Sequence, residues 1–167
     1  MADVSQRKLL LSRWGQLRDE RSSWIDHWRE ISEYLLPRSG RFLATDRNRG
    51  EKKHNSIYDS TGTRALRVLA AGMMAGMTSP ARPWFRLTTS DPQLDESAAV
   101  KAWLADVTRL MQMVFAKSNT YRALHSMYEE LGAFGTASSI VLADFDTVIH
   151  HYTLTAGEYA LAANSRG

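Results

Sequence analysis

The first 37 residues carry one hydrophobic stripe at helical spacing. Seven apolar residues and one arginine recur at alternating steps of four and three positions, which places them on one face of a helix. They are Leu10, Trp14, Leu17, Arg21, Trp24, Trp28, Ile31 and Leu35. The pattern predicts a single long helix over residues 4–36, ended by Pro37. Its tryptophans indicate a packing surface, because the alternative role of stacking on nucleic-acid bases requires exposed rings.

A second helix, over residues 63–77, is rich in small residues. The short oxygen-bearing side chains of residues 59–61 are suited to cap its start, and Pro80 helps to end it. A glycine inside a helix costs about 1 kcal/mol relative to alanine. Because Gly72 and Gly76 lie four positions apart on one face, we expect another backbone to approach that face closely.

Two further helices and an antiparallel sheet are expected in the rest of the chain. Apolar residues at helical spacing predict helices over residues 96–117 and 121–134. Shorter apolar runs predict strands over residues 138–145 and 147–154, turning near Asp146, and a third strand over residues 158–163. The predicted fold is therefore α+β and mainly α, with a long N-terminal helix, three further helices and a short antiparallel segment.

We interpret residues 1–167 as one region with four successive parts. A sheet of two or three strands is poorly supported alone, so we expect either a longer protein or other chains that complete the sheet. The parts are a long helix over 1–37, a basic loop over 38–57, a helical body over 58–136 and the start of an antiparallel sheet over 137–167.

Composition excludes several classes of protein. Apolar residues make up 44% of the chain, and there is no cysteine, so neither a disulfide scaffold nor a thiolate metal site is available. The longest nearly uncharged run, residues 68–78, is far shorter than the roughly 20 residues needed to cross a bilayer. We expect a soluble protein with no membrane partner.

The net charge of +3 hides a local basic segment. Residues 38–54 hold six basic side chains against two acidic ones, so the segment is either a solvated surface loop or a sequence-independent phosphate contact. A stand-alone DNA-binding module is therefore one possible function. The candidate DNA contacts are Arg38, Arg41, Arg47, Arg49, Lys52 and Lys53.

A metal-dependent nuclease is a weaker alternative. Asp144, Asp146 and His150 alternate with apolar residues, and two carboxylates with an imidazole can hold a divalent cation. However, Asp146 is expected at the turn, and the polar side of a hairpin normally carries such residues. His151 points to the opposite face from His150, so the two cannot form a simple two-histidine site. We expect no metal site, no cofactor and no catalytic residue.

An ordered set of short motifs resembles the head-to-tail connector (portal) proteins of short-tailed, podovirus-type bacteriophages. The resemblance covers about residues 14–165, and each motif is weak alone, whereas the ordered set is specific. The motifs are Trp24 and Trp28 with Tyr34-Leu-Leu-Pro37, Ile57-Tyr-Asp-Ser-Thr-Gly, Leu69-Ala-Ala-Gly, Thr78-Ser-Pro, Trp84-Phe-Arg-Leu, Ser118-Asn-Thr-Tyr121, Phe134-Gly-Thr136 and Gly157-Glu-Tyr-Ala160.

The resemblance implies a non-enzymatic subunit of a dodecameric ring at one capsid vertex. In that family the ring nucleates head assembly, docks the terminase motor, passes double-stranded DNA and later holds the tail. It belongs to the virion, and to the host cytoplasm during assembly. Family members are several times longer, so this chain would be the N-terminal, wing-like part, with the stem, clip and crown after Gly167. The residues that we expect to pack between subunits are Trp14, Trp24, Trp28, Gly72, Gly76 and Trp84.

Overall fold

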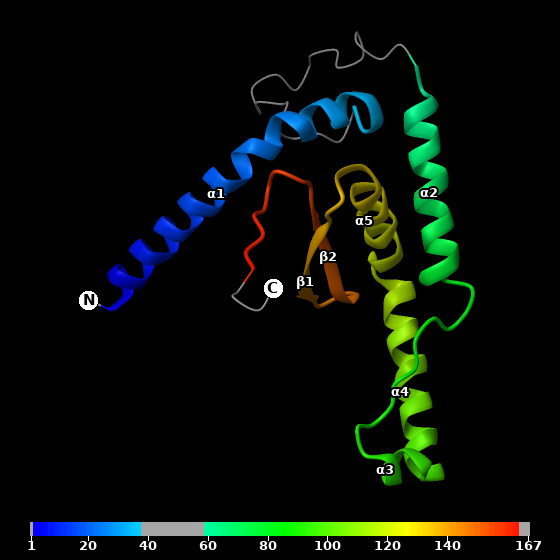
Figure 1. Cartoon of the computed structure of the whole chain (residues 1–167). Helices are drawn as coiled ribbons and strands as arrows, with labels where there is room; N and C mark the ends of the chain where they lie inside the picture. The colour runs from blue at the N-terminus through cyan, green and yellow to red at the C-terminus, as the bar shows by residue number, and fades with distance from the viewer. Residues whose placement is uncertain (1, 38–58, 164–167) are drawn as a thin grey trace. The chain divides into compact units, whose positions relative to one another are not determined.

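The computed structural model describes residues 2–37 and 59–163. The predicted basic loop over 38–57 lies outside these residues. The described part is mainly helical and ends in one antiparallel hairpin, which confirms the predicted fold class (Figure 1). Its elements are α1 (Ala2–Leu35), α2 (Thr61–Met77), α3 (Pro92–Glu96), α4 (Ala98–Lys117), α5 (Thr120–Phe134), β1 (Ser138–Asp144) and β2 (Val148–Leu154).

The short helix α3 was not predicted. Asp91 caps it by accepting a hydrogen bond from the backbone N–H of Gln93 at 2.9 Å, and Pro92 occupies its first turn. An aspartate followed by a proline is a helix-start signal, but the helix of five residues is too short to show a hydrophobic period. The predicted cap of α2 is confirmed, because Asp59 accepts a hydrogen bond from the N–H of Thr61 at 3.0 Å.

The chain divides into two compact units. The first unit is drawn from residues 1–66, 130–138 and 154–167, as far as the structure describes them, and the second from residues 67–129 and 139–153. α2 and α5 each contribute one end to each unit.

The first unit has a small apolar core at the end of α1. Leu36, Leu66, Phe134 and Ala156 are its buried members, and Trp28 packs against them. Burial of such side chains contributes about 25 cal/mol for each Å² of apolar surface removed from water. A buried carboxylate joins this core to the backbone: Glu130 accepts a hydrogen bond from the N–H of Ala156 at 3.1 Å, and Ala156 is fully buried.

The close approach of two backbones occurs at Gly62 and not at the predicted pair. A Cβ atom at Gly62 would lie 2.9 Å from Leu35 Cδ2, the end of a flexible side chain, and 3.3 Å from the backbone oxygen of Tyr34, so a side chain has little room where α2 begins against the end of α1. At Gly72 and Gly76 a Cβ atom would meet no described atom within 4 Å. The expected close contact at these two glycines is therefore absent within the described chain.

The second unit is held by an aromatic cluster, by a hydrogen bond between two buried hydroxyls and by the hydrogen bonds of one asparagine side chain. The ring of Trp84 lies 4.8 Å from that of Phe85 and 6.0 Å from that of Phe115, measured between centroids. The buried hydroxyls of Thr78 and Tyr128 lie 2.9 Å apart and share a hydrogen bond. Because both hydroxyls are paired, their burial carries no desolvation penalty for an unmatched group.

Asn119 connects the junction of α4 and α5 to β2. Its side-chain oxygen accepts a hydrogen bond from the N–H of His151 at 2.8 Å, and its side-chain nitrogen donates to the carbonyl of His151 at 2.8 Å. The amide therefore pairs with both backbone groups of one strand residue, as a residue of a neighbouring strand would.

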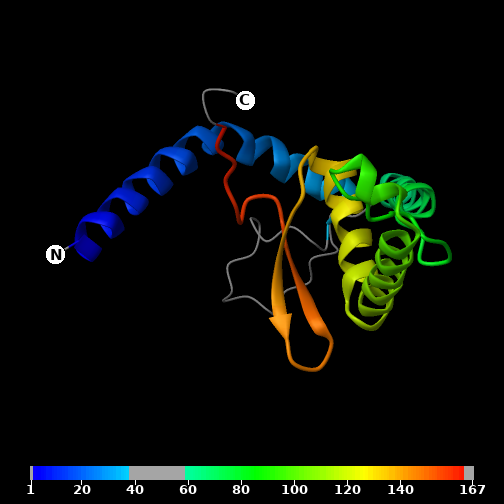
Figure 2. The ribbon, with the colours of Figure 1, turned by 90° about the horizontal axis from the view of Figure 1, so that it is seen from below.

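The hairpin turns at residues 145–147, as predicted, and forms a sheet of two strands (Figure 2). The predicted third strand over residues 158–163 is wrong, since the structure has irregular backbone there. Gly157 has φ +97°, and the N–H of Glu158 bonds back to the carbonyl of Thr155 at 2.9 Å, so a turn interrupts the extended run. The carbonyl of Tyr159 is occupied by the side chain of Arg21.

Within the described ranges, no helix combines the length and apolar character that a membrane span requires.

Candidate assembly interface

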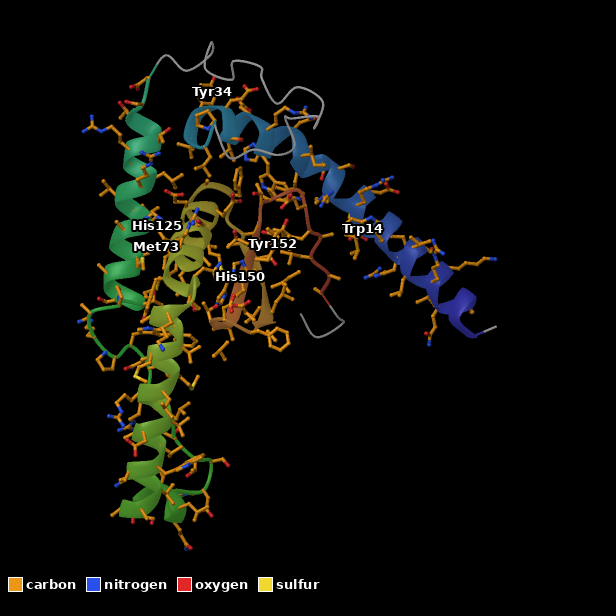
Figure 3. The ribbon with its side chains drawn as sticks, turned by 180° about the vertical axis from the view of Figure 1, so that it is seen from behind. Trp14, Tyr34, Met73, His125, His150 and Tyr152 are labelled. Carbon is orange, nitrogen blue, oxygen red and sulfur yellow. The ribbon has the colours of Figure 1, made fainter. Side chains whose placement is uncertain are left out.

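The stripe on α1 is only partly covered. Its C-terminal half packs into the core of the first unit through Trp28, Ile31 and Leu35. In its N-terminal half, Leu10 is 66% exposed and Trp14 is 42% exposed (Figure 3). Leu9 and Leu11 are also exposed beside them. Apolar side chains gathered in this way mark a surface that is typically covered by another protein.

Arg21, the charged member of the stripe, has a structural role in the first unit. Its guanidinium donates a hydrogen bond to the backbone oxygen of Tyr159 and lies 5.9 Å from the centre of the Trp14 ring. Its Nε atom is buried and has no hydrogen-bond partner among the described residues. The side chain therefore ties the segment after β2 to α1 while keeping one donor unused.

A groove of about 350 Å³ lies beside Arg21. α1 forms one wall, and the other walls come from the end of α5 and the segment after β2. The hydroxyls of Thr136 and Tyr159 lie 3.0 Å apart in this lining, and burial raises the pKa of Tyr159. The lining residues are Leu17, Glu20, Arg21, Trp24, Trp28, Phe134, Thr136, Tyr159 and Leu161.

The hairpin in the second unit presents a second apolar surface. Phe145, at the turn, is fully exposed, and Val148 is 60% exposed. On β2 the exposed positions alternate, so that Val148, His150 and Tyr152 share one face and His151 lies on the other (Figure 3). On β1 the run of exposed residues from Ile140 to Leu142 does not alternate. A two-stranded sheet with apolar residues on its exposed face requires a partner to be well supported.

The turn is fixed by side-chain hydrogen bonds. One oxygen of Asp144 accepts from the N–H of Thr147 at 2.8 Å and from its hydroxyl at 2.6 Å. These hydrogen bonds lower the pKa of Asp144. The hydrogen bond from the Thr147 hydroxyl has the larger effect, and the one from the Thr147 N–H comes next. Val148 adopts φ 71°, a left-handed conformation that is rare for a β-branched residue.

The hydrogen bonds of Asp144 bear on the hypothesis that Asp144, Asp146 and His150 bind a metal ion. Asp146 lies at the turn, as predicted, and Asp144 already accepts two hydrogen bonds through one of its oxygens. No group of three metal-ligating side chains occurs within residues 2–37 and 59–163. The arrangement offers no support for cation binding by Asp144, Asp146 and His150.

Comparison with known families identifies the chain. A family profile described as "Bacteriophage head to tail connecting protein" matches residues 7–167. The chain belongs to this family of head-to-tail connecting proteins. The resemblance to portal proteins drawn from the ordered motifs is thereby confirmed.

Two curated relatives extend over almost all of the chain. The "Probable portal protein" of Bordetella phage BPP-1 is 80% identical over 167 residues, which are 100% of this chain and 30% of the relative. The "Portal protein" of Salmonella phage epsilon15 is 44% identical over 163 residues, which are 98% of this chain and 29% of the relative. The chain therefore spans about 30% of the length of these relatives.

The residues that were predicted to pack between subunits differ in their exposure. Trp14 and Trp24 are exposed, and a side chain added at Gly72 or Gly76 would meet open space. Trp28 is half-buried against the core of the first unit. Trp84 is half-buried in the aromatic cluster, where its ring nitrogen donates to the hydroxyl of Tyr121 at 3.4 Å. The six candidate DNA-contacting residues of the basic loop lie outside the described residues.

The exposure of the hairpin tip and of Leu9 and Leu11 was not predicted from the sequence, whereas Leu10 was predicted as a member of the stripe. Two signals were available in the sequence. Residues 140–143 form an uninterrupted apolar run where one polar face was expected, and Phe145 occupies a turn position that favours polar residues and glycine.

Proposed function

We propose that this chain is the N-terminal part of a portal subunit that assembles into a closed ring at one vertex of the phage capsid. The observation that carries the proposal is the family match over residues 7–167, together with 80% identity to a relative named "Probable portal protein". Because the chain covers 30% of that relative, the proposal concerns the longer subunit to which such a region would belong.

The exposed apolar surfaces support assembly. Trp24 is 56% exposed, Leu10 is 66% exposed and Phe145 is fully exposed, so large apolar side chains on both units face water in the single chain. Covering one such side chain contributes about 1.5–3 kcal/mol. Several of them on one subunit are a reason for copies to associate, and a head-to-tail contact repeated around an axis closes a ring.

The finer features of the function follow from the same family. The ring would be a dodecamer that passes double-stranded DNA, and it would dock the terminase, capsid proteins and tail or adaptor proteins. It would be a part of the virion and would assemble in the host cytoplasm, with no catalytic step of its own. The basic loop would contact DNA phosphates without reading sequence, through Arg38, Arg41, Arg47, Arg49, Lys52 and Lys53.

Electron microscopy of the purified full-length subunit tests the proposal. We expect closed rings of one size, with a matching mass by native mass spectrometry or analytical ultracentrifugation. A full-length protein that stays monomeric at high concentration would refute it. The longer gene product should be used, because a fragment can lack surfaces that the assembly needs.

A further inference from the structure

We propose that the first half of α1 in one copy lies along the second half of α1 in the next copy of the ring. The first half comprises residues 2–18 and the second half residues 19–35. α1 belongs entirely to the first unit, so both surfaces come from that unit. This inference rests on the proposed ring assembly and names a contact that would build it.

The two halves of α1 carry opposite net charge. The first half has four basic residues and one acidic residue, and the second half has five acidic and two basic residues, so the net charges are +3 and −3. The four basic residues of the first half and the five acidic residues of the second half are all exposed. They are Arg7, Lys8, Arg13 and Arg18 in the first half and Asp19, Glu20, Asp26, Glu30 and Glu33 in the second. Each half is therefore electrostatically complementary to the other.

The stability of α1 itself does not account for this distribution. The dipole of a helix favours basic residues in its last turn, but the last turn of α1 contains Glu33 and no basic residue. The two basic residues of the second half are already engaged within the chain. Arg29 pairs with Asp26 at 2.7 Å, and Arg21 donates a hydrogen bond to a backbone carbonyl.

The first half also presents an apolar surface among its basic side chains. Steps of three and four positions place Arg7, Leu10, Trp14 and Leu17 on one face of the helix. Arg7, Leu10 and Trp14 are exposed on this face. A complementary partner therefore offers apolar contact together with negative charge.

The second half has a face of that kind. Steps of four and three positions link Glu20, Trp24, His27, Ile31 and Tyr34. Trp24 is 56% exposed and Tyr34, near the end of α1, is 70% exposed (Figure 3). The ring of Trp24 lies 6.5 Å from that of His27, measured between centroids. The exposed aromatic rings and Glu20 together match the apolar and basic face of the first half.

The charges favour a second copy as the partner. Residues 38–54 hold six basic side chains against two acidic ones, so this segment is repelled by the basic first half. One α1 helix cannot bring its own two faces together. Positions 10 and 27 lie about 26 Å apart along the helix, at 1.5 Å per residue. The acidic half of α1 is therefore available to the basic half only from another copy.

A parallel arrangement, offset by half a helix, matches the two faces. The 34 residues of α1 divide into two halves of equal length. This offset brings Leu10 level with His27 and Arg13 level with Glu30 of the next copy. The contact uses different surfaces on the two copies, and such a head-to-tail contact generates rings. An antiparallel arrangement would be two-fold symmetric and would end at a dimer.

Engineered disulfides test the contact in the full-length protein. Leu10→Cys and His27→Cys are introduced together, because both positions are exposed and lie too far apart in one helix to be bridged. Under oxidation we expect a ladder of covalent oligomers on a non-reducing gel that disappears on reduction. The controls are the parent protein, each single variant, and the pair of Leu10→Cys with Leu94→Cys. Leu94 is exposed and lies in the second unit.

Electron microscopy of the same samples separates the two claims. Rings with a ladder above the controls support the contact. Rings with no ladder above the controls mean that another part of the subunit covers α1, which overturns the contact and leaves the proposed function in place. Covalent dimers without larger oligomers show antiparallel pairing and also overturn the contact. A parent protein that forms no ring overturns the proposed function and this inference with it.

Charge reversal reports on the same contact without a cross-link. Arg13→Glu and Glu30→Arg are each expected to raise the concentration at half-assembly about tenfold, because like charges then face each other between copies. The double variant restores the opposite charges and should return to within about threefold of the parent. The matched control is Arg67→Glu, since Arg67 is an exposed arginine outside α1. Single reversals that act no more strongly than the control would overturn the inference, and so would a double variant that assembles no better than the singles.

Discussion

Removal of the Asn119 amide is expected to destabilise the second unit measurably. This side chain makes two hydrogen bonds of 2.8 Å to the backbone of His151, and both lie in a partly buried place. A hydrogen bond within a protein contributes about 0.5–1.5 kcal/mol net, so Asn119→Ala should lower the free energy of unfolding by about 1–3 kcal/mol. In a chain of this length, that corresponds to a fall of about 2–12 °C in melting temperature.

Asn119→Asp separates the two hydrogen bonds. The aspartate retains an oxygen that accepts the N–H of His151, but its second oxygen faces the carbonyl of His151 and cannot donate when ionised. We expect Asp at this position to be at least as destabilising as Ala near pH 7. Below the carboxyl pKa, the protonated group can donate a hydrogen bond again. The free energies of unfolding of the Asp and Ala variants should therefore become more similar at low pH.

Urea unfolding followed by circular dichroism measures both variants, with the midpoint and the slope fitted separately. The control is Ser90→Ala, because Ser90 is exposed and has no side-chain hydrogen bond among the described residues. The structural reasoning would be refuted if Asn119→Ala changed the free energy of unfolding by no more than the control.

Three further predictions concern the glycines, one histidine and the basic loop. Gly62→Ala should destabilise the chain by about 1 kcal/mol, because its Cβ would lie 3.3 Å from the backbone oxygen of Tyr34 and would displace the end of the Leu35 side chain. Gly72→Ala and Gly76→Ala should each stabilise the isolated chain by about 1 kcal/mol, and thermal melting gives both signs. Burial lowers the pKa of His151 below 6.5, so the contribution of the neutral imidazole to the free energy of unfolding should be fully present above pH 6.5 and should decrease as the pH falls below it. In the His151→Asn variant, the melting temperature should depend less on pH between pH 7 and pH 5. Alanine at Arg47, Arg49, Lys52 and Lys53 should weaken DNA binding and reduce the slope of log affinity against log salt by about 0.9 for each lost phosphate contact, as fluorescence anisotropy would show.

Periodicity predicted the elements whose own residues determine their structure. The stripe on α1 and the spacing within α5 identified long helices, and the turn near Asp146 was located between two apolar runs. Periodicity also marked Arg21 as the exception on its stripe, and the structure supplies the reason in its contact with Tyr159. What periodicity does not determine is which part of a stripe is covered, since Trp28 is packed and Leu10 is exposed on the same face.

Features that depend on distant contacts were not predictable from local patterns. Three glycines of α2 look alike in the sequence, and only the proximity of the end of α1 makes Gly62 the crowded one. The prediction of a third strand was wrong for a similar reason. Gly157 turns the chain, and the carbonyl of Tyr159 accepts a hydrogen bond from Arg21, which lies 138 positions earlier. Trp14 and Trp24 were predicted to pack between subunits and are exposed in the structure, and that packing stays a prediction, whereas the exposure of the hairpin tip was visible only in the structure.

Electron microscopy of the full-length protein, purified without other phage components, is the most direct test of the proposed ring assembly. The predicted result is a population of closed rings of uniform size whose mass corresponds to a fixed number of subunits. The contradictory result is a folded protein that remains monomeric at the highest concentration reached.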